Sequence, residues 1–292
     1  MQKQIPVILD TDIGTDIDDS WALLMMLQSP ELKVELITTA TLNTAHRTAI
    51  AAKMLAAAKR TDVPIGTGAM ENHGPLPISD WIADFDMASY PGRVLHDGVD
   101  AMIRTIMDSQ EPVTLISIGP LPNVAEALKR EPRIAHKAKF VGMHGSVYKG
   151  YGNNPDPCAE YNVIQNVAAA QAVFSAPWDM VITPLDTCGI VALDGKHYET
   201  VACASNSAAQ ALIESYRCWL KGKPDAGKSS ILFDTVAIHL AYSEQYLTLR
   251  DIPIVISDDG FTRVDEKGKA VRVAVEWEAL GAFKDDLVRR LI

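Results

Sequence analysis

The chain has 292 residues, of which 22% are charged and 48% are hydrophobic, so disorder and fibrous structure are excluded. At this length, one large α/β domain or two smaller domains could each bury a sizeable core. The formal net charge of -10 argues against a nucleic-acid backbone or an anionic membrane surface as the main partner, because both require a basic footprint.

Short aliphatic or β-branched runs alternate along the chain with longer amphipathic segments. The runs predict buried strands at 6–9, 34–39, 113–118, 139–143 and 179–185. The amphipathic segments predict helices at 20–28, 44–59, 99–107, 123–130 and 162–174. Because strands and helices alternate, the sequence predicts an α/β fold with an open, mostly parallel sheet flanked by helices.

The end of the chain shows a different pattern. Two apolar runs, IPIVIS and VRVAVEW, flank turn-rich residues between 252 and 276, which predicts a short antiparallel hairpin. The segment KGKPDAG at 221–227 is typical of a surface loop. No linker, charge block or internal repeat divides the sequence, so we expect residues 1–292 to form a single domain.

The N-terminus and the cysteines indicate where the protein resides. The first ten residues lack the apolar core and cleavage site of a signal peptide. No stretch of about 18 apolar residues occurs, so no membrane span is expected. The four cysteines are widely spaced without a CxxC pair, which favours reduced thiols and a cytoplasmic location.

Polar clusters follow directly after the predicted strands. They comprise Asp10 with Asp12, Asn43, GPLPN at 119–123, HGS at 144–146, and Asp186. Ligands of open parallel sheets bind at the carboxyl ends of the strands, so these clusters predict one shared site at that edge. Loops after strands are usually polar, so any one of these clusters could be an ordinary loop. That explanation is weaker for five clusters that all lie at the same edge.

The densest cluster is LDTDIGTDIDDSWALL at 9–24, which contains five aspartates within ten residues. Such crowding at the end of a buried strand is unfavourable unless a cation neutralises the carboxylates or some of them titrate. Oxygen ligands favour Ca²⁺ or Mg²⁺ over Zn²⁺. Helix caps and solvated turns would explain one or two of the aspartates but not five.

A second polar concentration lies in YGNNPDPCAEYN at 151–162. It combines the amides of Asn153, Asn154 and Asn162 with the carboxylate of Glu160, and no Lys or Arg is nearby. This composition suits a neutral polyhydroxylated ligand such as a sugar, whereas a phosphate site would show cations or a glycine-rich cradle. Taken alone, the segment is equally well explained as a loop followed by a helix cap.

Six motifs occur in order over nearly the whole chain: LDTDIGTDIDD at 9–19, LN at 42–43, GPLPN at 119–123, NPDPCAEYN at 154–162, FDTVA at 233–237 and GFTRVD at 260–265. Together they resemble the nucleoside hydrolase family, the inosine/uridine-preferring ribohydrolases. The resemblance implies an open α/β fold, a bound Ca²⁺ and hydrolysis of the N-glycosidic bond of ribonucleosides to ribose and free base. It also implies a role in purine and pyrimidine salvage, a small nucleoside or riboside as partner, and a homo-dimer or homo-tetramer.

The same resemblance implies roles for individual residues. The metal ligands would be Asp12, Asp19, Asp234 and the main-chain carbonyl of Pro122. A metal-bound water would be the nucleophile, and Asp12 would take its proton as general base. Substrate contacts would come from the residues that match the ribose-binding positions, namely Asp18, Asn43, Met143, Asn154, Glu160, Asn162 and Asp234; of these, Asp18 and Asn43 are also counted as catalytic.

Two positions depart from the family pattern. The aspartate loop is longer than in many relatives, since Asp16 and Ile17 separate the turn from the pair Asp18 and Asp19, so Asp16 could cap the helix or join the metal ligands. Purine-cleaving members often have His before the late aspartate, whereas this chain has Phe233, which cannot donate a proton to a departing base. Other candidates for the leaving-group or base contacts are His96, His144, Tyr216 and Trp219.

Two other functions remain open from the sequence. A strand ending in DxD also resembles haloacid dehalogenase-type phosphatases, which use Mg²⁺, but Gly14 stands where that family expects Thr or Val. The pair Asp18 and Asp19 would then have no role, so this alternative ranks lower. The other alternative is a catalytically weak ribose- or nucleoside-binding homologue, which Phe233 supports.

Overall fold

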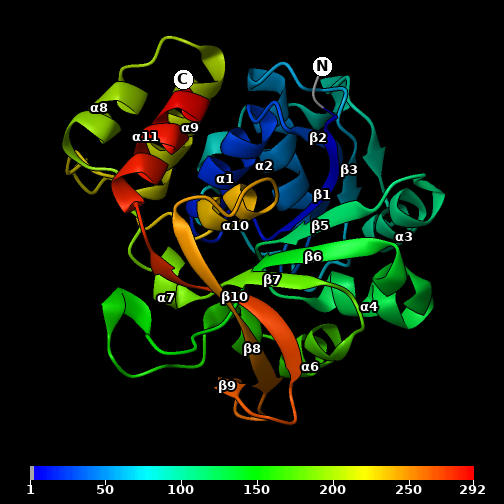
Figure 1. Ribbon diagram of the computed structural model, residues 1–292. Coiled ribbons are helices and arrows are strands. Elements are labelled where there is room, and N and C mark those ends of the chain that lie inside the picture. Colours follow the sequence, from blue (N-terminus) through cyan, green and yellow to red (C-terminus); the bar gives the residue numbers. More distant parts are fainter. Residues whose placement is uncertain (1–2) are drawn as a thin grey trace.

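A ten-stranded sheet forms the centre of the computed structural model, which describes residues 3–292, and its strand order is β4-β3-β2-β1-β5-β6-β7-β10-β8-β9 (Figure 1). Every neighbouring pair from β4 to β10 is parallel, and the pairs β10-β8 and β8-β9 are antiparallel. The strands are β1 (Ile5–Thr11), β2 (Leu32–Thr39), β3 (Ile65–Thr67), β4 (Val94–Leu95), β5 (Val113–Ser117), β6 (Ala138–Met143), β7 (Met180–Thr183), β8 (Leu247–Ile256), β9 (Thr262–Val264) and β10 (Lys269–Trp277).

Helices cover both faces of the sheet because successive side chains of a strand point to opposite sides. In β1, Val7 and Leu9 belong to one buried cluster and Ile8 to the other. The Val7 side is packed by α1 (Asp18–Leu27), α2 (Thr44–Ala57), α9 (Ser207–Trp219), α10 (Thr235–Leu240) and α11 (Leu280–Leu291). The Ile8 side is packed by α3 (Gly98–Asp108), α4 (Pro122–Arg130) and α6 (Val167–Ser175). The remaining α-helices are α5 (Tyr161–Ile164), α7 (Leu185–Cys188) and α8 (Gly195–Ala202).

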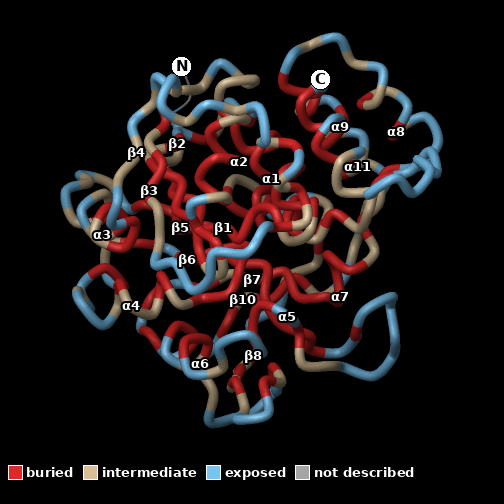
Figure 2. The backbone as a smooth tube through the Cα atoms, turned by 180° about the vertical axis from the view of Figure 1, so that it is seen from behind, coloured by how far each residue is buried: buried red, intermediate tan, exposed pale blue. Residues whose placement is uncertain are grey.

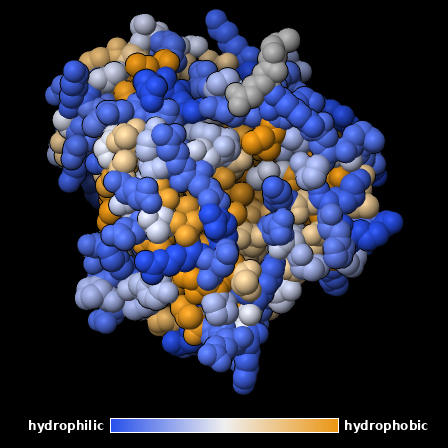
Figure 3. All heavy atoms as spheres, viewed as in Figure 1, coloured by the Kyte–Doolittle hydropathy of each residue, from blue (hydrophilic) through white to orange (hydrophobic). Residues whose placement is uncertain are grey.

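Burial follows this layering. Figure 2 shows buried residues concentrated in the strands and in the helices packed on them, with exposed residues in the peripheral loops. Every residue of α1 is buried, including two aspartates, as expected for a helix covered on all sides. On the face seen in Figure 3 the surface is mainly hydrophilic, and apolar residues reach it near the middle of the view.

The predicted α/β fold is confirmed, and the strands and helices lie within a few residues of their predicted positions. One predicted helix, at 162–174, is two helices, because the Asn166 side chain accepts a hydrogen bond from the Ala169 N–H and starts α6 afresh. The predicted C-terminal hairpin exists as β8 paired with β10, with β9 added on the other edge of β8.

Across residues 3–292, no helix is both long enough and apolar enough to cross a membrane.

Candidate active site

The carboxyl ends of the central strands open into a cavity of about 330 Å³. Its walls consist of carboxylates, aromatic rings and a few small or polar side chains: Asp12, Asp16, Asp18, Asp19, Glu160 and Asp234; Tyr151, Tyr161, Trp219 and Phe233; and Thr15, Ile118, Met143 and Asn162. Of the five polar clusters predicted to converge here, only the cluster after β1 lines the cavity, through Asp12. The ends of β5 and β6 reach the cavity through Ile118 and Met143, whereas Asn43, Asp186 and the segments 119–123 and 144–146 do not line it.

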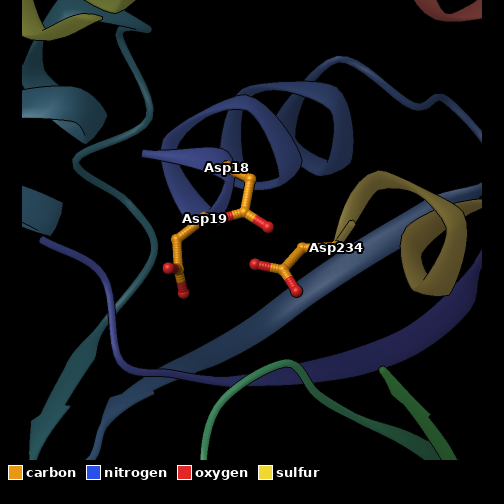
Figure 4. A group of neighbouring side chains, drawn as sticks. All are labelled: Asp18, Asp19 and Asp234. Atoms are coloured by element: carbon orange, nitrogen blue, oxygen red, sulfur yellow. The ribbon is translucent and has the colours of Figure 1, made fainter. Parts of the chain in front are cut away.

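Three carboxylates from two distant segments meet at this cavity. Asp18 and Asp19 open α1, and Asp234 directly precedes α10. Figure 4 shows their side chains pointing toward a common space, and one carboxylate oxygen of each lies within 4.8 Å of the others. The starts of two helices thus bring the carboxylates together, and helix N-termini favour negative charge.

This trio is electrostatically costly without a counter-charge. Burial raises the pKa of Asp18, Asp19 and Asp234, and neighbouring aspartates raise each of them further. The Thr11 hydroxyl donates a hydrogen bond to Asp19, which lowers the pKa of Asp19 and so offsets part of the rise. A set of closely spaced, buried carboxylate oxygens fits a hard divalent cation, which would compensate the crowded charges.

Asp12 also faces the cavity but is not part of the trio. Its Oδ2 lies 3.8 Å from Nη2 of Arg47, whose side chain is completely buried. Arg47 itself is fixed by donating to the carbonyl oxygens of Ile13 and Thr41 and to the Thr15 hydroxyl. Burial raises the pKa of Asp12, while the Arg47 charge opposes that change.

The other two aspartates of the N-terminal cluster have different positions. Asp10 does not line the cavity; its Oδ1 accepts hydrogen bonds from the Thr38 hydroxyl and the Asn123 amide, and burial raises its pKa to about 7. It therefore links β1 to β2 and α4. Asp16 lines the cavity and accepts a 2.7 Å hydrogen bond from the Ile17 N–H, so it shapes the loop before α1.

Glu160, Asn162 and Met143, which the resemblance implies as substrate contacts, line the cavity. The Glu160 carboxylate accepts N–H bonds from Gly145, Asn162 and Val163, and burial raises its pKa to about 7. The Asn162 amide donates to the carbonyl oxygens of Ile118 and Met143. These bonds attach the start of α5 to the ends of β5 and β6, which keeps this wall rigid.

Three predicted substrate or metal contacts lie outside the cavity. Asn43 caps α2, with its oxygen on the His46 N–H and its amide donating to the Gly74 carbonyl. Asn154 lies in an exposed loop and accepts from the Asp156 N–H. Pro122 begins α4 and lines a separate small hollow, although Tyr161 borders both that hollow and the main cavity.

Of the residues predicted to contact the leaving group, Trp219 and Phe233 line the cavity. The structure corrects two others. His96 follows the edge strand β4 and lies in a surface hollow beside α3. Tyr216 is buried in the core, and its hydroxyl donates to the Lys228 carbonyl. His144 is also buried, hydrogen-bonded to Gly119, and does not line the cavity.

Sequence reasoning missed two aromatic residues of the cavity, Tyr151 and Tyr161. Both lie in the segment 151–162, which was singled out for its amides and its carboxylate. A signal was available, because the segment follows β6 and so lies near the same sheet edge. A tyrosine hydroxyl can also hydrogen-bond a polar ligand, as the amides and the carboxylate of this segment can.

The chain is similar to several known proteins. A family model described as inosine-uridine preferring nucleoside hydrolase matches residues 7–284. A pyrimidine-specific ribonucleoside hydrolase, RihA, of Escherichia coli O1:K1 is 34% identical over 196 residues, which are 62% of this chain and 60% of that protein. RihA of Enterobacter sp. (strain 638) is 31% identical over 224 residues, 72% of this chain and 69% of its own length.

Two solved structures share the fold. A plant nucleoside hydrolase superposes with a TM-score of 0.83 at 21% identity and 99% coverage of both chains. A purine-preferring ribonucleoside hydrolase from Gardnerella vaginalis gives a TM-score of 0.76 at 22% identity and 98% coverage of both chains. Because the family model spans residues 7–284, this chain belongs to the inosine-uridine preferring nucleoside hydrolase family.

Proposed function

We propose that this chain hydrolyses the N-glycosidic bond of ribonucleosides to ribose and a free base, with the help of a Ca²⁺ ion. The observation that carries the proposal is the convergence of Asp18, Asp19 and Asp234 within 4.8 Å at the cavity that Asp12 also lines. Membership of the nucleoside hydrolase family supports the same reaction. A phosphatase of the haloacid dehalogenase type would leave the pair Asp18 and Asp19 without a role.

The proposed ligands of the ion are Asp12, Asp19 and Asp234, with Asp18 next to them, and the carbonyl oxygen of Pro122. Pro122 lines a hollow that adjoins the cavity, since Tyr161 borders both. The donor set supports Ca²⁺ because it contains oxygen atoms only and because several carboxylates are needed to bind a large, hard cation. When bound, the ion would supply charge compensation and Lewis acidity. Side chains of this chain would carry out the other steps, namely substrate binding and proton transfer.

Asp12 is the proposed general base, because its carboxylate faces the cavity and the buried Arg47 holds the loop around it. Asp18 and Asn162 would bind ribose hydroxyls. As the bond to the base breaks, positive charge develops on the ribosyl group, and the surrounding carboxylates favour that state over the neutral substrate. Asn43 and Asn154 are left out, since their side chains bond elsewhere.

The test is a panel of purine and pyrimidine nucleosides, with p-nitrophenyl riboside, assayed for release of reducing sugar in Ca²⁺ and in EDTA. We expect hydrolysis that requires the cation and is abolished by Asp12→Asn. The matched control is Asp108→Asn, which removes a carboxylate at an exposed position on α3. Release of phosphate from phosphoesters, or full activity of Asp12→Asn, would contradict the proposal.

One observation supports a second candidate function. Phe233 lines the cavity directly before Asp234 and carries no group that can donate a proton. A homologue that binds ribose or nucleoside with little turnover would have this feature. Saturable nucleoside binding in calorimetry, without sugar release from any member of the panel, would establish this second function instead.

A further inference from the structure

The cavity is lined by carboxylates, among them Asp12, Asp18 and Asp19, and by the apolar ring of Phe233. A departing base carries negative charge on its nitrogen and is stabilised by a hydrogen-bond donor. Phe233 cannot be that donor, so efficient cleavage of nucleosides calls for another side chain near it.

Tyr151 lies against Phe233. The two rings are edge to face, with centroids 6.1 Å apart and planes at 83°. The Tyr151 hydroxyl oxygen accepts a 3.0 Å hydrogen bond from the Tyr161 N–H. Since that bond uses only the oxygen, the hydroxyl proton is available for a ligand in the cavity that Tyr151 lines.

The loop that carries Tyr151, between β6 and α5, is held at several points. The Asp186 carboxylate accepts the N–H groups of Val147 and Tyr148 at 2.9 and 2.8 Å. The Gly150 N–H donates to the Asn154 carbonyl, which closes the turn around Tyr151. The hydroxyl is therefore presented by a braced loop, as a positioned hydrogen-bond donor requires.

The other cavity tyrosine, Tyr161, has different neighbours. It also borders the hollow lined by Pro122, a proposed ligand of the ion, whereas Tyr151 lies against the ring of Phe233. A general base and a donor to the leaving group act on opposite faces of the reacting carbon.

Building on the proposed hydrolysis, we propose that the Tyr151 hydroxyl donates a hydrogen bond to the departing base. The bond between the ribose carbon and the base nitrogen breaks, its electron pair goes to the base, and Tyr151 stabilises the charge without losing its proton. Water adds to the ribosyl carbon and gives one proton to Asp12. That proton reaches the base through solvent, so the products are ribose and the neutral base.

The experiment compares wild type with Tyr151→Phe on nucleosides and on p-nitrophenyl riboside, whose leaving group needs no hydrogen bond. We expect kcat on nucleosides to fall by about 100-fold, with KM changed by less than about threefold. Activity on p-nitrophenyl riboside should stay within about threefold of wild type. Tyr148→Phe, at an exposed position in the same loop, should match wild type on both substrates.

The outcomes separate this inference from the proposed function. If wild type cleaves neither kind of substrate, the proposed function itself fails. Two results with an active wild type would refute the role of Tyr151. In one, Tyr151→Phe loses activity equally on nucleosides and on p-nitrophenyl riboside; in the other, it loses activity on neither. The same holds if the leaving-group-dependent loss appears in Tyr161→Phe instead, or if wild type cleaves only p-nitrophenyl riboside. Circular dichroism and thermal melting confirm that each variant is folded.

Discussion

The carboxylates of Asp18, Asp19 and Asp234 are close together, buried and directed at one space. Their mutual repulsion and their desolvation lower the free energy of unfolding when no cation is present. Natural proteins accept such a cost at functional sites, where the bound ligand offsets it. The trio therefore links ligand binding to stability at the level of single residues.

Asp234→Asn tests that link. The substitution keeps the shape of the side chain but removes one negative charge, so the melting temperature in EDTA should be at least as high as that of wild type. Added Ca²⁺ should raise the melting temperature of wild type and leave Asp234→Asn nearly unchanged, because a ligand stabilises only a protein that binds it. Thermal melting with and without Ca²⁺ measures both effects. An equal Ca²⁺ response in the two proteins would contradict the assignment of Asp234.

His144 provides a pH test away from the carboxylates. Its Nε2 lies 3.1 Å from the Gly119 carbonyl, and burial lowers its pKa to about 4. The unfolded chain takes up this proton near pH 6.5, before the folded protein does, so stability falls as pH drops from about 6.5 toward 4. Between pH 7 and 5 this residue should remove about 2 kcal/mol from the free energy of unfolding.

Urea unfolding of wild type and His144→Gln at the two pH values isolates this contribution. The variant lacks the titrating ring, so its stability should change less between pH 7 and 5 than that of wild type. Equal changes in the two proteins would show that His144 is not the responsible group.

At the scale of elements, the connections after the strands set the geometry of the site. The connection from β5 to α4 passes so close to β1 that a Cβ on Gly119 would lie 2.7 Å from Oδ1 of Asp12 and 2.8 Å from its backbone nitrogen. Two neighbouring parallel strands thus share one narrow space at their carboxyl ends, and glycine at 119 leaves room for the Asp12 carboxylate.

Gly119→Ala should therefore displace Asp12 and reduce kcat/KM by more than about tenfold, since small misplacements of catalytic groups are costly. Steady-state hydrolysis of a nucleoside measures the loss. Gly281→Ala in α11 is the control, because a Cβ there meets no atom within 4 Å, and its activity should equal that of wild type. Normal activity of Gly119→Ala would show that the loop relaxes without moving the carboxylate.

Sequence patterns predicted the elements that contain a clear apolar run or a clear repeat of apolar residues. The apolar runs at 34–39 and 113–118 are buried strands, and the aspartates after β1 do line the cavity. The strands β3 and β4, with three and two residues, are too short to show a period. For His96, the sequence could not reveal that β4 lies at the outer edge of the sheet, far along the strand order from β1 and β5.

At the scale of the whole molecule, we propose that residues 1–292 act as one domain. Support comes from the sheet, which includes both the first and the last parts of the described chain, and from the two buried clusters, one on each of its faces. Asp18 from an early segment and Asp234 from a late one meet at the same cavity, so the site depends on the complete fold.

One domain predicts one cooperative unfolding transition. Far-UV circular dichroism and tryptophan fluorescence should give coincident denaturation curves, because the five tryptophans are distributed along the chain. Saturating Ca²⁺ at about 100 times its Kd should shift both curves together by about 2.7 kcal/mol. Two separated transitions would show that the chain contains independently folding parts.

The position of β10 has a consequence for how the protein is made. β10 follows β8 and β9 in the chain but lies between β7 and β8 in the sheet. While the ribosome is still synthesising residues before 269, the edge of β7 has no partner, and β8 with β9 has nothing to connect it to the other strands. Unpaired strand edges promote aggregation. The nascent chain therefore exposes an unpaired edge on β7 and on β8 until β10 emerges and joins the two parts.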